Sequence, residues 1–263
     1  MVWIETSWAW GGAALAVGGV AALGARAMFS SRSRLLGPVV FRGSCADPPR
    51  VALTFDDGPE ARFTPRILDV LGEHGVKAAF FVIGLNAERH PDLVERVHRE
   101  GHVVGNHSYA HHRLGTLRGV RYWRAELDRA DAVIESIIGR PPRLFRPPMG
   151  FRNIHLARAV RQRRHLTVTW TLRGLDTVRP QPPRIIQRVL SRVRSGDIVA
   201  LHDGREPGRH RDLEATIAAL PGLIEGVRDR FQLVRLDALI GSAAYRGPVT
   251  GSTSGAATAR DGG

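Results

Sequence analysis

Short apolar runs and amphipathic segments alternate along the middle of this chain, and this alternation limits the folds that it can adopt more than any other feature. The runs expected to form strands are residues 51–55, 78–84, 102–106, 166–170, 197–203 and 231–236. Helical spacing of apolar residues falls at 63–75, 91–102, 122–139, 185–194 and 213–227. Alternating strands and helices predict an α/β fold with a parallel sheet, either a barrel or an open doubly wound sheet.

Ionisable side chains follow several of these segments at the point where each one ends. In chain order they are Asp56 and Asp57, His107 and His111, Arg146, Asp176, and His202 with Asp203. Each is weak evidence alone, because Asp-Gly-Pro is usually a turn and an isolated His-x-x-x-His usually has no function. Both candidate architectures gather functional groups at the carboxyl ends of their strands. The conjunction therefore predicts one shared site rather than a set of surface turns and helix caps.

Asp56 and Asp57 are adjacent carboxylates, and neighbouring like charges repel each other. His107 and His111 are four residues apart, a spacing that directs two imidazoles the same way on a helical turn. With Asp57 they form a two-histidine, one-carboxylate set, which suits a divalent metal with open coordination positions. We expect zinc first, while cobalt, manganese and nickel suit the same ligands. A cation on Asp57 would let Asp56 stay ionised and act as a base toward water.

The N-terminal part of the chain contains an apolar run, residues 8–29, whose only charged residue is Arg26. Its length suffices for a membrane-spanning helix. The alternatives are a cleaved signal peptide and a buried helix. A signal peptide begins with basic residues, whereas the only charged residue before this run is the acidic Glu5. We expect residues 1–30 to be a single-pass anchor in a bacterial cell membrane and 31–46 a juxtamembrane linker. The arginines after the span favour a cytoplasmic main domain by the positive-inside rule.

The formal net charge is +13, and arginine supplies almost all of the positive charge. Such a surplus favours an anionic partner, such as lipid head groups, phosphorylated sugars or nucleic acid, although a solvated arginine-rich surface is the simpler explanation. No nucleic-acid-binding motif is present, so we expect no nucleic acid partner. The single cysteine, Cys45, excludes an internal disulfide and a cysteine-based zinc site. Residues 241–263, rich in Gly, Ala, Ser and Thr, are expected to form a disordered tail.

Four short motifs occur in an order that resembles a known family. They are TFDDGP (54–59), HSYAH (107–111), RPPMG (146–150) and LHD (201–203), with a segment from Trp170 to Asp176 before the last. They resemble the polysaccharide deacetylase family, the NodB-homology domain of carbohydrate esterase family 4. The match covers about residues 47–240. The resemblance implies a distorted (β/α) barrel there, and the apolar run at residues 8–29 places one N-terminal transmembrane helix before it.

The resemblance also implies a role for each matched position in the hydrolysis of an acetamide. The implied roles are general base for Asp56, metal ligands for Asp57, His107 and His111, support of Asp56 for Arg146, general acid for His202, orientation of His202 for Asp176, and an oxyanion contact for the backbone N–H of Met149. The reaction needs a nucleophile, charge stabilisation for an oxyanion and a proton for the departing amine, and these residue types supply all three.

Four positions depart from the family pattern. His112 stands where proline is common, Met149 where an aromatic is common, Thr177 where tryptophan is usual, and Ala200 where a larger aliphatic residue often occurs. The catalytic positions are intact, but the aromatic lining of the substrate groove is reduced.

Two enzymatic functions are compatible with these features. The first removes N-acetyl groups from a cell-envelope polysaccharide, peptidoglycan or chitin-like, outside the membrane, and the family resemblance favours it. The second removes an acetyl or formyl group from a lipid-linked amino sugar at the membrane surface, and the anchor, the arginines and the reduced aromatic lining favour it. A third possibility is a non-catalytic, membrane-tethered carbohydrate-binding protein, but the presence of Asp56 and His202 argues against it.

Overall fold

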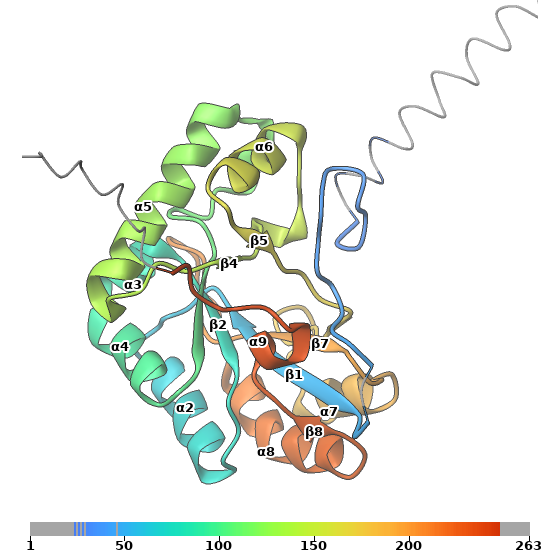
Figure 1. Cartoon of the computed structure of the whole chain (residues 1–263). Coiled ribbons are helices and arrows are strands. Elements are labelled where there is room, and N and C mark those ends of the chain that lie inside the picture. The colour runs from blue at the N-terminus through green and yellow to red at the C-terminus, as the bar shows by residue number, and fades with distance from the viewer. Residues whose placement is uncertain (1–23, 25, 27, 29, 46, 248–263) are drawn as a thin grey trace, which may run out of the picture.

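A computed structural model of the protein describes residues 24, 26, 28, 30–45 and 47–247 (Figure 1). The predicted membrane span at residues 8–29 lies almost entirely outside the described residues, as does most of the predicted tail. Within the described part of the chain, no helix combines the length and the apolar character needed to cross a bilayer.

One 8-stranded sheet forms the centre of the domain, and all of its named strands pair in parallel. The strands are β1 (Arg50–Asp56), β2 (Ala79–Val82), β3 (Val103–Asn106), β4 (Leu144–Phe145), β5 (Leu166–Thr167), β6 (Leu172–Arg173), β7 (Ile198–His202) and β8 (Gln232–Leu233). Their order is β5-β4-β3-β2-β1-β7-β6, with β8 beside β1. Each connection between two parallel strands must return to the opposite end of the sheet, and it usually does so through a helix. This requirement explains why strands and helices alternate in the sequence.

The α-helices lie outside the sheet, with α2 to α5 along one flank and α7 and α8 along another (Figure 1). Their bounds are α2 (Thr64–Glu73), α3 (Gly84–Arg89), α4 (Pro91–Arg99), α5 (Val120–Ile138), α6 (Ile154–Gln162), α7 (Pro182–Leu190), α8 (Glu214–Arg228) and α9 (Leu236–Ile240). Two 3₁₀ turns, Arg113–Leu117 and Pro148–Gly150, precede α5 and α6. The sequence patterns missed α3, α6, α9, β4 and β6, and all of these except α6 are at most six residues long.

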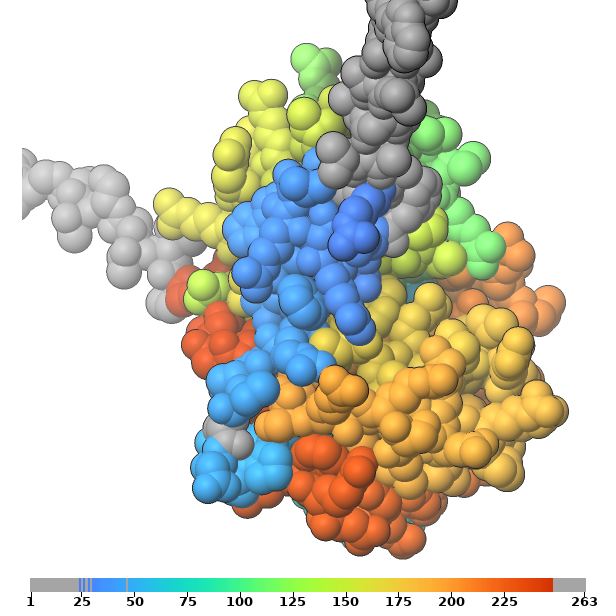
Figure 2. Space-filling model, turned by 90° about the vertical axis from the view of Figure 1, so that its right-hand side faces the viewer, coloured from blue at the N-terminus to red at the C-terminus, as the bar shows by residue number. Residues whose placement is uncertain are grey.

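The sheet curls into a half-barrel, and its edge strands β5 and β6 follow each other directly in the chain. Residues 30–43 lie along this side. Val40 pairs with Val168, Arg42 pairs with Asp197, and the hydroxyl of Thr169 donates to the Ser31 carbonyl at 2.7 Å. Figure 2 shows this N-terminal segment, in blue, against the yellow part of the domain. Much of the predicted linker at 31–46 is therefore packed against the domain.

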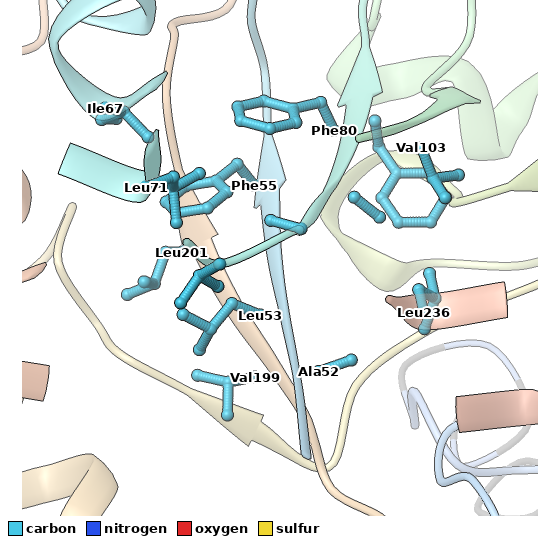
Figure 3. Packing of buried hydrophobic residues seen from close by; sticks show 14 of the residues in the cluster. Ala52, Leu53, Phe55, Ile67, Leu71, Phe80, Val103, Val199, Leu201 and Leu236 are labelled. Carbon is cyan, nitrogen blue, oxygen red and sulfur yellow. The ribbon is translucent and has the colours of Figure 1, made fainter. Parts of the chain in front are cut away.

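The core surrounds β1, in which every residue from Val51 to Asp56 is buried. Leu53 and Phe55 pack with Val199 and Leu201 of β7 and with Leu71 of α2 (Figure 3), and all five are at most 1% exposed. Burying such side chains contributes about 1.5–3 kcal/mol each. The strand that ends at Asp56 is therefore held firmly by the core.

The domain continues past Gly241, the residue at which the composition predicts the start of a disordered tail. Tyr245 is buried, pairs with Pro142, and accepts a hydrogen bond from the Val104 N–H at 3.1 Å. Arg246 forms an ion pair with Asp131 at 2.6 Å. That boundary was wrong for residues 242–246, because one buried aromatic and one ion pair anchor a segment whose composition is otherwise typical of disorder.

This packing predicts that the segment contributes to stability. Tyr245→Ala should lower the free energy of unfolding by about 3 kcal/mol, because it removes a buried aromatic ring. Tyr245→Phe keeps the ring and removes only the hydroxyl, so a loss of about 1 kcal/mol is expected. Urea unfolding followed by circular dichroism measures both. An alanine variant as stable as the wild type would show that the segment does not belong to the folded core.

Candidate active site

Asp56 and His202 end two neighbouring strands, and the pairing of β1 with β7 places them opposite each other in register. After Asp56 the chain turns sharply, and Asp57 adopts the left-handed conformation with φ 73°. The next position must be glycine, because a Cβ on Gly58 would lie 2.0 Å from the Asp203 carboxylate. The Asp-Asp-Gly sequence therefore turns the second carboxylate out of the sheet.

Asp57, His107 and His111 meet at the carboxyl edge of the sheet, as predicted. The Asp57 Oδ1 atom lies 3.4 Å from the Nε2 atom of each histidine, and all three side chains are buried. The Nδ1 atom of His107 lies 2.7 Å from the Arg146 carbonyl oxygen, so it carries the proton and leaves Nε2 free as a ligand.

The histidines are not presented by a helical turn, contrary to our expectation from their spacing. Residues 107–111 form a loop in which Ser108 and His111 have φ 65° and 52°. Asn106 Oδ1 accepts from the Ser108 N–H at 2.7 Å, and Glu126 Oε2 accepts from two further N–H groups of the loop. Side chains from β3 and α5 thus replace the hydrogen bonds that a helix would supply.

The donor set fits a divalent cation. Two imidazole nitrogens and one carboxylate oxygen lie within 4.8 Å of one another, which is close enough for all three to bind one ion. Three protein ligands leave open positions for water or substrate, as in catalytic sites. The set does not distinguish zinc from cobalt, manganese or nickel.

The second oxygen of Asp57 has a partner that the sequence did not reveal. Arg211 Nη1 lies 2.8 Å from Asp57 Oδ2. Burial acts to raise the pKa of Asp57, but His111 and His107 outweigh it and hold that pKa below its usual range. Glu206, also in this pocket, pairs with Arg113 at 2.7 Å. Arg211 and Glu206 lie in the long loop after β7, where no motif or spacing marks them.

Asp56 is held by Arg146, whose side chain is completely buried. Arg146 Nη1 donates to Asp56 Oδ1 at 2.6 Å and to the Thr54 hydroxyl at 2.8 Å, while Nη2 donates to the Thr169 carbonyl at 3.1 Å. The guanidinium also lies over the Phe81 ring, 4.0 Å from its centroid. These contacts fix the carboxylate of Asp56 and balance its charge in the interior.

His202 is held by Asp176, which lies behind it and is fully buried. Asp176 accepts from the His202 backbone N–H at 2.8 Å, and the Nδ1 atom of His202 lies 3.0 Å from its other oxygen. Burial alone would lower the pKa of His202, but Asp176 raises it to about 9. His202 is therefore a protonated acid at neutral pH.

This arrangement predicts a pH dependence. Activity should decline as the pH rises through about 9, because His202 then loses its proton. Asp176→Asn removes the stabilising charge, so this alkaline limb should move to lower pH and kcat/KM at pH 7 should fall by roughly 10²-fold. The interaction of protonated His202 with Asp176 also stabilises the folded protein. This contribution is complete below pH ~6.5, the pKa of histidine in the unfolded chain, and it disappears as the pH rises toward 9. A pH–rate profile of both proteins tests the assignment, and an alkaline limb unmoved in Asp176→Asn would refute it.

The described side chains enclose a pocket of about 230 Å³. Its lining includes Asp56, Asp57, His107, His111, Met149, Trp170, Arg173, Thr177, Ala200 and His202. Arg146 and Asp176 lie behind this lining and contact it through Asp56 and His202. Met149 has φ 57°, which turns its backbone at the pocket wall. The structure thus brings every predicted site residue to this pocket or directly behind it.

One feature of the lining differs from expectation, and one position outside it agrees with expectation. Trp170 supplies an aromatic wall, although Met149 and Thr177 replace the aromatics that are common in the family. His112 is exposed and is not part of the pocket lining, which agrees with the departure at that position being outside the chemistry.

The sequence is similar to proteins of known activity. The family model of polysaccharide deacetylase matches residues 43–167. A peptidoglycan-N-acetylglucosamine deacetylase of Bacillus cereus is 34% identical over 180 residues, which are 68% of this chain and 64% of that protein. A chitooligosaccharide deacetylase of Sinorhizobium fredii is 36% identical over 192 residues, which are 71% of this chain and 89% of that protein. The chain thus spans slightly under two thirds of the first relative and most of the second.

Solved structures share the fold. The Bc1960 peptidoglycan N-acetylglucosamine deacetylase has a TM-score of 0.73 and 32% identity, and the match covers 79% of this chain and 95% of that one. A CE4 family pseudoenzyme from Bacillus anthracis, BA3943, has a TM-score of 0.68 and 26% identity, with 77% of this chain and 68% of that one covered. With relatives above 30% identity across most of their length and this shared half-barrel, the chain belongs to the polysaccharide deacetylase family, the NodB-homology proteins of carbohydrate esterase family 4.

Proposed function

We propose that this protein is a metal-dependent hydrolase that removes N-acetyl groups from amino-sugar residues of a cell-envelope polysaccharide, either peptidoglycan or a chitin-like polymer. The observation that carries the proposal is the register of β1 and β7, which sets Asp56 opposite His202, beside the Asp57, His107 and His111 cluster. A carboxylate base and a protonated imidazole on one pocket wall are the two groups that hydrolysis of an amide needs.

A divalent cation bound by Asp57, His107 and His111 would act as a Lewis acid and make water a stronger acid. Asp56, oriented by Arg146, accepts the proton of the attacking water as oxygen adds to the acetyl carbon. The backbone N–H of Met149 stabilises the negative charge that develops on the carbonyl oxygen. His202 then donates its proton to the nitrogen as the C–N bond breaks, releasing acetate and a free amino sugar.

The test is acetate release from a chitooligosaccharide and from peptidoglycan by the full-length protein supplied with zinc. One amine should appear for each acetate released. Absence of both products from both substrates with any of the four metals would overturn the polymer assignment and leave the lipid-linked substrate described next and the non-catalytic alternative; a solved structure of a CE4 family pseudoenzyme shows that non-catalytic members exist.

A second candidate substrate is a lipid-linked amino sugar that carries an acetyl or formyl group. The observation in its favour is the apolar character of the pocket wall, where Val178 is 64% and Met149 38% exposed. Release of acetate or formate from an undecaprenyl-linked amino sugar, at a higher kcat/KM than from chitooligosaccharide, would identify this substrate.

We also propose that the chain is anchored in the bacterial cell membrane by residues 1–30. The support is the apolar sequence of residues 8–29. A reporter fused after the last residue tests which side the domain faces: phosphatase activity places it outside, with the polymer, and fluorescence of a cytoplasmic reporter places it inside.

A further inference from the structure

The acidic side chains of the pocket all have cationic partners, but one pocket arginine has no acidic partner. The ion pairs are Asp56 with Arg146, Asp57 with Arg211, and Glu206 with Arg113. Arg173 also lines the pocket, and among the described residues no carboxylate lies within ion-pair distance of its guanidinium. The pocket therefore holds an unbalanced positive charge in addition to the charge of any bound metal.

The side chain of Arg173 is ordered by an aromatic ring rather than by an anion. Its guanidinium carbon lies 5.3 Å from the centroid of Trp170, and the same ring contacts Arg146 at 5.6 Å. Trp170 itself is fixed, because it is buried and packs so closely on Gly150 that a Cβ there would lie 2.7 Å from the ring. A guanidinium stacked in this way keeps its edge N–H donors available and loses little freedom when it binds an anion.

The surroundings of Arg173 are also electropositive. Residues 171–196 contain arginines at 173, 179, 184, 188, 192 and 194, and their only acid is Asp176, which is engaged by His202. Burial and the nearby charges of Arg192, Arg173 and Arg179 together lower the pKa of Arg188. Arg173 therefore belongs to a positively charged segment that attracts anions over a distance.

We propose that Arg173 binds an acidic substituent of the substrate, a carboxylate or a phosphate, so that the preferred substrates are anionic glycans. The fork of N–H donors on arginine matches the oxygens of either group in a bidentate contact. This inference rests on the proposed function, because it assigns the substrate class of the same pocket.

The test measures the binding of three tetrasaccharides to the full-length protein by isothermal titration calorimetry. Chitotetraose is the neutral probe, a peptidoglycan tetrasaccharide supplies lactyl carboxylates, and chitotetraose 6-phosphate supplies phosphate. At low ionic strength the wild type should bind at least one acidic probe about tenfold more tightly than the neutral one, and salt should weaken this preference. The acidic probe that binds more tightly identifies the natural group.

Arg173→Gln should reduce the preference to within about twofold, because it removes the charged fork. Arg192→Gln is the matched control, since it removes an equal charge from an exposed position outside the pocket lining. It should lower the preference by no more than about twofold, because only long-range attraction is lost. Equal binding of all probes by the wild type, or a preference that survives in Arg173→Gln, overturns the inference. Acetate release from the same probes is measured separately. Release of acetate without tighter binding of the acidic probes refutes this inference alone. Tighter binding of the acidic probes without release of acetate refutes the proposed function alone.

Discussion

Asp56→Asn is expected to lower kcat/KM for acetate release by about 10³-fold, because the amide cannot accept the proton of the attacking water. The substitution is nearly isosteric, so the side chain can still accept from the Nη1 atom of Arg146. It nevertheless leaves the buried charge of Arg146 without a counter-charge, and removing one partner of a buried ion pair can cost about 3–5 kcal/mol of stability. Thermal unfolding must therefore be measured beside the kinetics, at a temperature where both proteins are folded.

Asp203→Asn is a matched control for this variant. Asp203 is also a buried aspartate at the carboxyl edge of the sheet, where it accepts from the Thr64 hydroxyl at 2.7 Å. Burial and the charges of Asp56 and Asp57 outweigh that hydrogen bond and raise the pKa of Asp203 to about 7. Since the carboxyl is already partly protonated at neutral pH, asparagine should change activity by no more than about threefold. If Asp56→Asn kept a tenth or more of the wild-type activity, Asp56 would not be the base.

Removing the metal is expected to abolish acetate release. A chelator should lower the rate to the background of uncatalysed hydrolysis, and adding zinc, cobalt, manganese or nickel back should restore it. His111→Ala should have nearly the same effect, because two ligands do not hold the ion. Its metal affinity should fall by more than the ~100-fold that loss of a supporting residue costs. Metal content, determined by mass spectrometry after dialysis, measures this loss of metal binding independently of activity.

His112→Ala is the matched control for the metal site. It removes the neighbouring imidazole, which is exposed and 6.4 Å from the Tyr122 ring, centroid to centroid. Metal content and rate should both stay at the wild-type level. Equal losses in the two alanine variants, or full activity in the chelated protein, would exclude a metal site formed by His111.

The sequence was informative where chemistry and local geometry coincide. Asp56, Asp57 and His202 stand at strand ends, and an apolar strand of a parallel sheet delivers its last residue to one edge in any such fold. The spacing of His107 and His111 correctly indicated that both imidazoles face the same metal site. The expected helical turn was wrong, because residues with left-handed backbone conformation and hydrogen bonds to Glu126 shape that loop.

The parts that could not be predicted depend on contacts between distant segments. Arg211 reaches Asp57 across 154 positions of the chain, from a loop without regular structure. Tyr245 is a single buried ring in a segment whose composition otherwise indicates disorder. The apolar run at 166–170 predicts a strand that includes Trp170, yet β5 ends at Thr167 and Trp170 lines the pocket. The pattern of polar and apolar residues describes neighbours in the sequence, whereas the positions of Arg211, Tyr245 and Trp170 depend on neighbours in space.

The register of β1 and β7 ties the spacing of Asp56 and His202 to the backbone ladder of the sheet. The histidine loop leaves this ladder after His107, and side-chain hydrogen bonds from Asn106 and Glu126 hold much of its backbone. A loop of this kind opens at a lower free energy than a buried strand does. Under gentle warming or dilute denaturant, the cation should therefore escape from a molecule that is otherwise native. Inactivation of that kind would be reversible, and it would precede the loss of circular dichroism.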